Sequence, residues 1–202
     1  MKLYFTPETR SLRPRWLLEE LGVPYELSKL DLSKDEQKQP WYMKVHPLGV
    51  VPALEIDGFT VIETAAIVMH LADKYPEKGL APAVGTKERA EYYQWISLAM
   101  TEAEPPLINI LLNTQILPEA ERQPAAVKQG TERFKFVASV VEKHMQGRNY
   151  IVGDKFTAAD VVMGGVLRLG GRLGQLGPFP VLQAYLKRLV ERPAAVRAIN
   201  NQ

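Results

Sequence analysis

The sequence predicts an α/β domain followed by an all-α domain. Its first third alternates short runs of strand-forming residues with helical segments, and a turn-rich stretch follows at residues 77–85. Beyond that stretch the periodicity is helical throughout. The length of 202 residues suffices for two small domains, and 46% hydrophobic with 24% charged residues is typical of globular proteins. We therefore expect one domain at residues 1–78 and a second at 87–202.

The first expected unit is a strand, a helix and a second strand. Residues 3–5 form a short apolar run rich in strand-forming side chains. A helix is expected over residues 11–21, because Ser11 suits the N-cap position and Gly22 suits the position after a helix end. Residues 25–32 roughly alternate apolar and polar side chains, which indicates a strand. Two strands flanking one helix imply parallel pairing.

A β-hairpin and another helix complete this domain. Residues 51–56 and 59–62 are strand-like runs separated by an Asp-Gly pair, which is a strong local signal for a hairpin. A helix is expected at residues 64–75, with Pro76 ending it. The stretch at residues 33–49 is mixed and polar, so we expect an irregular loop with a short helix there.

The second domain is expected to contain only helices. Two adjacent prolines, Pro105 and Pro106, are expected to kink its first long helix. Thr157 and Asp160 have the spacing of a capping box before an apolar helix, so we assign them a structural role and no catalytic one. The expected helices cover residues 87–115, 119–146 and 157–172, with one or two short ones from residue 179 on.

Composition excludes several classes of function. The net charge of +2, with no basic run, argues against nucleic acid as a partner. Cysteine is absent, which excludes disulfides, thiolate metal sites and a cysteine nucleophile, and the three histidines match no metal-binding motif, so we expect no metal. No apolar run is long enough to span a bilayer, and the apolar start is too short for a signal peptide, so we expect no membrane association and a cytoplasmic location.

Four motifs occur in a characteristic order. They are Ser11-Leu12-Arg13 with the following stretch 18–26, the stretch 47–54 (PLGVVPAL), Glu63-Thr64, and the stretch 156–160 (FTAAD). In this order and spacing the chain resembles the cytosolic glutathione S-transferase superfamily, and within it the serine-type, theta-like bacterial members. The resemblance implies a thioredoxin-like N-terminal domain, an all-α C-terminal domain and glutathione as co-substrate. It also implies a homodimer.

The resemblance assigns two segments to the binding of glutathione. It implies a cis peptide bond between Val51 and Pro52, which would leave the Val51 main chain free to pair with the cysteinyl residue as an added strand would. A proline that simply begins a strand is the alternative explanation. Glu63 and Thr64 are implied to hold the γ-glutamyl end, because a helix N-terminus attracts a carboxylate. Ordinary helix capping explains the same pair, and both explanations can hold together.

The resemblance also implies how the thiol is activated. Ser11 would donate a hydrogen bond to the glutathione sulfur, although Ser11 alone reads as an N-cap. Thr9 is the second candidate for this role. Arg10 stands where beta-class members carry a reactive cysteine, which argues against mixed-disulfide chemistry. For the glycyl carboxylate we prefer Lys44, because it is the nearest in sequence to the motif at 47–49, with Lys38 and Gln39 as alternatives.

The expected function is therefore conjugation of the glutathione thiolate to a small apolar electrophile. Two alternatives use the same fold. One is a non-catalytic protein that binds glutathione or another ligand, and the other is a glutathione-dependent isomerase or reductase. Fold alone does not separate these alternatives, because function depends on the site.

Overall fold

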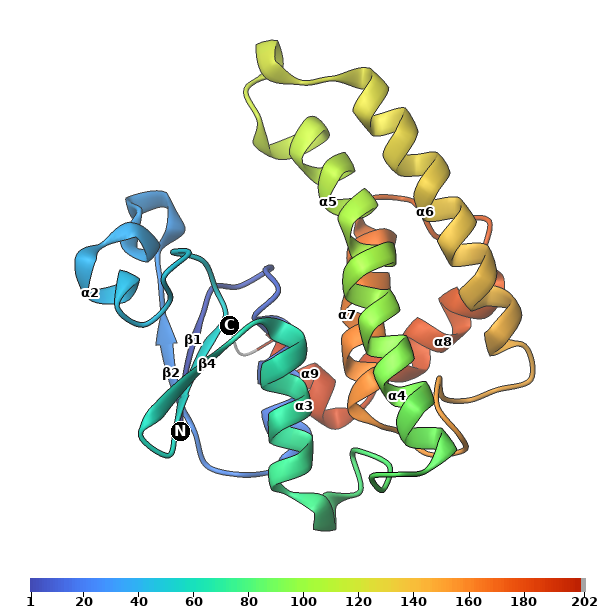
Figure 1. The fold of residues 1–202 in the computed structure, drawn as a ribbon. Helices are drawn as coiled ribbons and strands as arrows, with labels where there is room; N and C mark the ends of the chain where they lie inside the picture. Colours follow the sequence, from blue (N-terminus) through green and yellow to red (C-terminus); the bar gives the residue numbers. More distant parts are fainter. Residues whose placement is uncertain (201–202) are drawn as a thin grey trace. The chain divides into compact units, whose positions relative to one another are not determined.

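The computed structural model describes residues 1–200, which form two compact units (Figure 1). The first unit contains Met1–Ala81 together with the segment that begins at Glu191. The second unit is Pro82–Val190. The chain therefore leaves the first unit once, builds the second, and returns to the first with its last helix.

The first unit contains a four-stranded sheet and four α-helices. Short 3₁₀ turns occupy Leu32–Lys34, Glu36–Lys38 and Pro76–Lys78. The strands and helices are β1 (Lys2–Phe5), α1 (Leu12–Leu21), β2 (Glu26–Lys29), α2 (Pro40–Met43), β3 (Ala53–Ile56), β4 (Phe59–Ile62), α3 (Thr64–Lys74) and α9 (Pro193–Asn200).

The strands are ordered β2-β1-β3-β4, and their register brings three chain segments to one edge of the sheet. β1 runs parallel to β2, as the βαβ pattern predicts, and antiparallel to β3, with Tyr4 opposite Ala53. β3 and β4 form the expected hairpin, with Ala53 opposite Ile62. Asp57 and Gly58 turn it with φ values of 52° and 82°, as a type I′ turn requires. The end of β1, the start of β3 and the end of β4 consequently share one edge.

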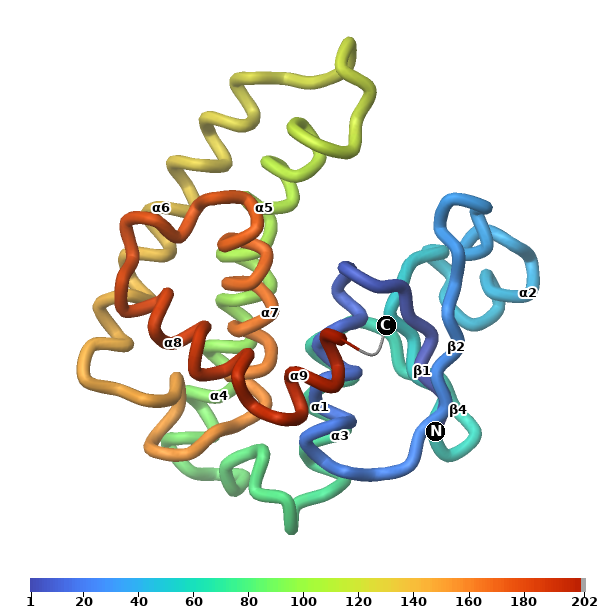
Figure 2. The backbone as a smooth tube through the Cα atoms, turned by 180° about the vertical axis from the view of Figure 1, so that it is seen from behind, coloured from blue at the N-terminus to red at the C-terminus, as the bar shows by residue number. Residues whose placement is uncertain are grey.

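Helices cover both faces of the sheet. Figure 2 shows α1 and α3 together on one side and α2 on the other. Leu17 and Leu18 of α1 and Ile67 of α3 are fully buried, as is Leu3 of β1. Because neighbouring strand residues point to opposite faces, Tyr4 instead joins the cluster on the α2 side, whose buried members are Tyr4, Leu30, Tyr42, Val51 and Ala53.

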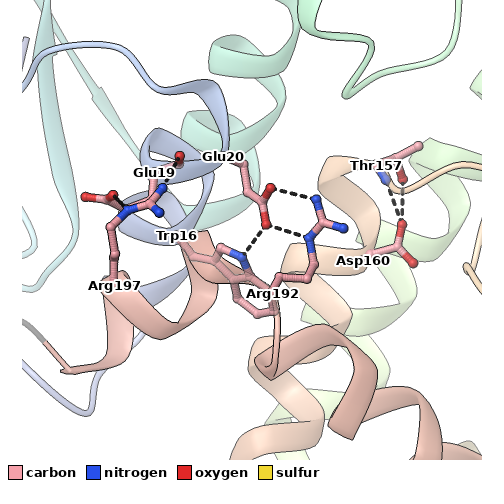
Figure 3. Close-up of polar contacts among 7 residues, drawn as sticks. All are labelled: Trp16, Glu19, Glu20, Thr157, Asp160, Arg192 and Arg197. Atoms are coloured by element: carbon pink, nitrogen blue, oxygen red, sulfur yellow. Dashed lines mark hydrogen bonds and ion pairs between the residues drawn. The ribbon is translucent and has the colours of Figure 1, made fainter.

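The last helix belongs to the first unit. Figure 2 shows α9 beside α1, and Figure 3 shows the contacts that join them. Arg192 donates to both carboxylate oxygens of Glu20 at 2.7 and 2.8 Å, and the indole of Trp16 donates to the same carboxylate at 3.0 Å. Arg197 donates to Glu19 at 2.7 Å. Sequence reasoning places this helix in the all-α domain, because its periodicity carries no information about its packing partner.

The second unit is entirely helical within the residues described. Figure 1 shows α4 and α5 continuing as one bent column. The expected kink at Pro105 and Pro106 takes the form of a π turn at Ala99–Ala103 just before them, because proline donates no N–H to the preceding turn. The helices are α4 (Lys87–Leu98), α5 (Glu104–Leu111), α6 (Pro124–Met145), α7 (Ala158–Arg172) and α8 (Pro180–Val190), with a second π turn at Leu112–Ile116 and a 3₁₀ turn at Glu119–Glu121.

A buried carboxylate organises the second unit. The capping box of Thr157 and Asp160 is present at the start of α7, as predicted (Figure 3). Asp160 also accepts hydrogen bonds from the Ile151 N–H at 2.9 Å and from the Tyr185 hydroxyl at 2.6 Å. Because Asp160 is fully buried, these donors compensate its removal from water. The structural role assigned from the sequence is confirmed.

Candidate functional site

The residues predicted to bind and activate glutathione come from three segments at one edge of the sheet. The loop containing Thr9 and Ser11 follows β1, Val51 and Pro52 precede β3, and Glu63 and Thr64 follow β4. Since Tyr4 pairs with Ala53 and Ala53 pairs with Ile62, these segments are neighbours through the strand register. The order of motifs along the chain does not reveal this proximity; the antiparallel placement of β3 beside β1 creates it.

The Val51–Pro52 peptide bond is cis, as the resemblance implies. Val51 itself is buried, and within residues 1–200 its main-chain N–H and C=O make no hydrogen bond to another residue. The preceding carbonyl is held differently, because the hydroxyl of buried Tyr42 on α2 donates to the Val50 oxygen at 2.7 Å. The arrangement fixes the chain before Val51 while leaving the Val51 main-chain groups open to an extended peptide.

A tight turn leads into this segment. Gly49 donates to the His46 carbonyl at 2.8 Å, and the Leu48 N–H donates to His46 Nδ1 at 3.3 Å. Burial lowers the pKa of His46, which keeps Nδ1 available as an acceptor at neutral pH. Gly49 has φ of 58°, and a Cβ there would lie 2.7 Å from the Met43 sulfur and 2.8 Å from the Gln37 carbonyl. Only glycine fits at this position.

The structure separates the two lysines considered for the glycyl carboxylate. The Lys38 ammonium donates to the Leu48 carbonyl at 3.3 Å, so it lies against the turn that precedes Val51. Lys44 ends α2 and is exposed. Among the described contacts none joins the Lys44 side chain to that turn, and none places Gln39 there. Lys38 therefore contacts the turn although Lys44 is nearer to it in sequence.

The start of α3 is a helix N-terminus without a protein cap. Glu63 precedes it with φ of 70° and ψ of 122°, and its side chain makes no capping hydrogen bond. No acidic residue occupies the first turn, and the first helical bond of α3 is donated by Ile67 to the Glu63 carbonyl. The N–H groups of Thr64, Ala65 and Ala66 thus face the end of the helix without an internal acceptor, which is the environment that binds a carboxylate.

The loop between β1 and α1 brings Thr9 and Ser11 together. Their hydroxyl oxygens are 2.5 Å apart, and both hydroxyls reach the Thr6 carbonyl, at 2.6 Å from Thr9 and 2.9 Å from Ser11. Ser11 stands at the N-cap position of α1 but makes no capping bond, because its oxygen accepts the Thr6 N–H at 3.0 Å. Glu8 has a positive φ of 59°, and non-glycine residues held in this region are concentrated at functional sites.

Some supporting residues have no recognisable signal in the sequence. Tyr42 reads as an aromatic residue in a polar loop, and nothing in its neighbourhood predicts its bond to the Val50 carbonyl. Thr6 contributes through its main chain, which no side-chain motif reveals. Within residues 1–200 no group of three or more histidine, cysteine or acidic side chains could hold a metal ion, and no helix is both long and apolar enough to cross a membrane.

Comparisons with known proteins agree over both units. Residues 1–73 match the glutathione S-transferase N-terminal domain, and residues 82–193 match the glutathione S-transferase C-terminal domain. Glutathione S-transferase GST-4.5 from Xanthomonas campestris is 29% identical over 191 residues, covering 94% of this chain and 93% of that protein.

Two solved structures extend the similarity to three dimensions. A sphingomonad glutathione S-transferase complexed with glutathione has a TM-score of 0.88 at 29% identity and covers 100% of this chain and 98% of its own. The glutathione transferase URE2P8 from Phanerochaete chrysosporium, solved with oxidized glutathione, has a TM-score of 0.90 at 28% identity, with 99% of this chain and 93% of that chain covered. This chain therefore belongs to the glutathione S-transferase family and is a glutathione transferase with a thioredoxin-like fold.

Proposed function

We propose that this edge of the sheet binds glutathione and that the enzyme transfers the glutathione thiolate to a small apolar electrophile. The observation that carries the proposal is the juxtaposition of three features. They are the unpaired Val51 main chain, the uncapped start of α3, and the hydroxyl pair of Thr9 and Ser11. Each feature suits one part of an extended tripeptide with a thiol at its centre.

The cysteinyl residue of glutathione would pair with Val51 as an added strand. The γ-glutamyl carboxylate would accept hydrogen bonds from the free N–H groups and the hydroxyl of Thr64, and exposed Glu63 would accept from the ammonium. For the glycyl carboxylate, the contact of Lys38 with the Leu48 carbonyl supports Lys38 over Lys44.

The thiol needs only modest stabilisation to ionise. A free thiol has a pKa of about 8.5, and lowering it by about two units takes roughly 2.7 kcal/mol. A hydrogen bond to a charged acceptor contributes about 1.5–3 kcal/mol, and the helix N-terminus adds about 0.3–1 kcal/mol. One hydroxyl at the start of α1 therefore suffices. The use of a hydroxyl group of this loop, in place of a cysteine, supports the serine-type, theta-like assignment. We also propose that the protein forms a homodimer.

A second candidate function is glutathione-dependent reduction. The observation that favours it is the structural relative solved with oxidized glutathione. A protein that binds glutathione without turnover is the remaining alternative. Its fold and glutathione affinity would be normal, but its bound thiol would not be activated.

Steady-state assays with glutathione and a panel of chlorinated, epoxide and hydroperoxide substrates test the proposal. We expect thioether formation with at least one chlorinated or epoxide compound and micromolar to millimolar glutathione affinity by calorimetry. Turnover of hydroperoxides alone would favour the reductase. Glutathione binding without turnover of any substrate would identify a ligand carrier, and absence of glutathione binding would overturn all three functions.

A further inference from the structure

The hydroxyls of Thr9 and Ser11 share one main-chain partner, residue Thr6. The Ser11 oxygen accepts the Thr6 N–H at 3.0 Å, and its own hydroxyl lies 2.9 Å from the Thr6 carbonyl. The Thr9 hydroxyl lies 2.6 Å from that same carbonyl and 2.5 Å from the Ser11 oxygen. These contacts form a closed hydrogen-bonded cluster at the end of β1.

Counting protons shows that either hydroxyl can satisfy the Thr6 carbonyl, although an outward turn of Thr9 would also release the Ser11 N–H, which the Thr9 oxygen accepts at 3.3 Å. Two hydroxyl protons serve three short contacts, and the 2.5 Å contact between the two oxygens needs one of them. Either Thr9 donates to the Thr6 carbonyl and Ser11 donates to Thr9, or Ser11 donates to the Thr6 carbonyl and Thr9 donates to Ser11. In the second arrangement the carbonyl no longer requires the Thr9 proton, so Thr9 can turn toward an external acceptor while the carbonyl stays satisfied.

Burial distinguishes the two hydroxyls. Ser11 has an exposed fraction of 0%, whereas Thr9 is partly exposed. An incoming sulfur atom is larger than a hydroxyl oxygen and cannot reach a side chain with no accessible surface unless the loop moves. Thr9 is reachable in the conformation observed, on the loop that the positive φ of Glu8 turns.

We propose that Thr9 donates the hydrogen bond to the glutathione thiolate, and that Ser11 is a positioning residue which takes over the Thr6 carbonyl when Thr9 turns outward. This inference rests on the proposed function and names the residue that performs it. No covalent bond to the protein forms, Thr9 stays protonated, and the thiol proton leaves to solvent. Hydrogen bonding from Ser11 would also polarise the Thr9 hydroxyl and strengthen its bond to sulfur.

The test is a double-mutant cycle read out as the pKa of the bound thiol. Thiolate absorbance in the ultraviolet is titrated against pH for glutathione bound to the wild-type protein, Thr9→Val, Thr9→Ser, Ser11→Ala and the double variant Thr9→Val with Ser11→Ala. We expect Thr9→Val to raise the thiol pKa by about one to two units, because the lost bond favours only the charged form. Thr9→Ser should stay near wild type.

The role of Ser11 predicts a non-additive result. Ser11→Ala should raise the thiol pKa by less than Thr9→Val does, since Thr9 then has to serve the Thr6 carbonyl. In the Thr9→Val background, Ser11→Ala should change the thiol pKa no further. At neutral pH the Thr9→Val rate should fall on the order of tenfold to a hundredfold, and the gap should narrow at high pH, where the thiol ionises unaided.

Other outcomes overturn the assignment. A full pKa rise in Ser11→Ala with none in Thr9→Val makes Ser11 the direct donor, and additive effects mean that both donate. An unchanged pKa in every variant means that neither hydroxyl stabilises the thiolate. In these cases the proposed function still stands, whereas a wild-type complex whose thiol pKa is not lowered removes the proposed function itself. Binding of S-methylglutathione, which has no ionisable thiol, verifies that each variant is folded. If Ser11→Ala does not fold, the comparison of the thiol pKa in Thr9→Val and Thr9→Ser decides whether Thr9 is the donor.

Discussion

Thr64 carries a hydroxyl at the uncapped start of α3, and the hydroxyl has no partner among the contacts of residues 1–200. Replacing it with valine keeps the shape and removes the donor. If the γ-glutamyl carboxylate binds there, Thr64→Val should weaken glutathione binding by about 1–3 kcal/mol, the cost of leaving a charged acceptor unmatched. Isothermal titration calorimetry measures the change. Thr64→Ser is the matched control and should bind as wild type does, whereas equal affinity of all three proteins would remove Thr64 from the site.

Asp160 carries a carboxylate whose oxygens accept two main-chain N–H groups and two hydroxyls while fully buried. Asp160→Ala leaves those N–H groups, of Ile151 and Thr157, without acceptors, at about 1–3 kcal/mol each. We therefore expect a loss of roughly 3–5 kcal/mol in the free energy of unfolding, measured by urea titration. Asp160→Asn retains one acceptor oxygen and should lose less. A loss below about 1 kcal/mol in Asp160→Ala would show that water replaces the carboxylate.

Between α1 and α9, the carboxylate of Glu19 links stability to pH. Burial by itself raises the pKa of Glu19, but hydrogen bonds from the Tyr25 hydroxyl and the Arg197 guanidinium lower it by more, so the net shift is downward. A lowered folded-state pKa stabilises the fold above the unfolded value of about 4.3, and this stabilisation is lost as the pH falls through the folded value. Glu19→Gln should therefore cost about 1–2 kcal/mol at pH 7.

The pH window makes this prediction specific. The difference in unfolding free energy between wild type and Glu19→Gln should be constant above about pH 5 and should shrink below about pH 4. Urea unfolding at a series of pH values measures it. A difference that persists unchanged in acid would mean that the glutamine disturbs packing and that the charge of Glu19 contributes nothing.

The elements whose ends carry local signals were predictable from sequence. The Asp57-Gly58 pair located the hairpin, and Gly22, with φ of 64°, ends α1 as expected. Ser11 also stands at the N-cap position of α1 as expected, but its side chain makes no capping bond, and its oxygen accepts the Thr6 N–H across the loop. The long helix expected from residue 119 begins at Pro124, since proline fits a first helical turn and the preceding residues form a separate 3₁₀ turn.

At the scale of the whole molecule, the motifs identified the three segments of the candidate site but did not predict that these segments lie side by side. Their proximity follows from the strand order, which no local pattern encodes. The choice between Thr9 and Ser11 likewise depends on burial, and both residues read alike as small hydroxyl side chains. The packing of α9 is the extreme case, because the contact between Glu20 and Arg192 joins residues 172 positions apart.

The return of the chain to its first unit predicts what removal of α9 does. A chain ending at Val190 loses the buried side chains of Ala194, Ala195 and Ala198 and leaves the carboxylate of Glu20, whose side chain is 8% exposed, without Arg192. Two charge-assisted contacts, of Arg192 with Glu20 and of Arg197 with Glu19, at about 1–3 kcal/mol each imply that the first unit loses roughly 2–6 kcal/mol of stability. Amide hydrogen exchange followed by mass spectrometry should show faster exchange in α1, while α4 to α8 retain their protection. Arg192→Gln, the matched control in the full-length chain, should show a smaller change confined to the same helix. Faster exchange in α4 to α8 with α1 unchanged would mean that α9 stabilises the helical unit, contrary to its observed contacts with α1.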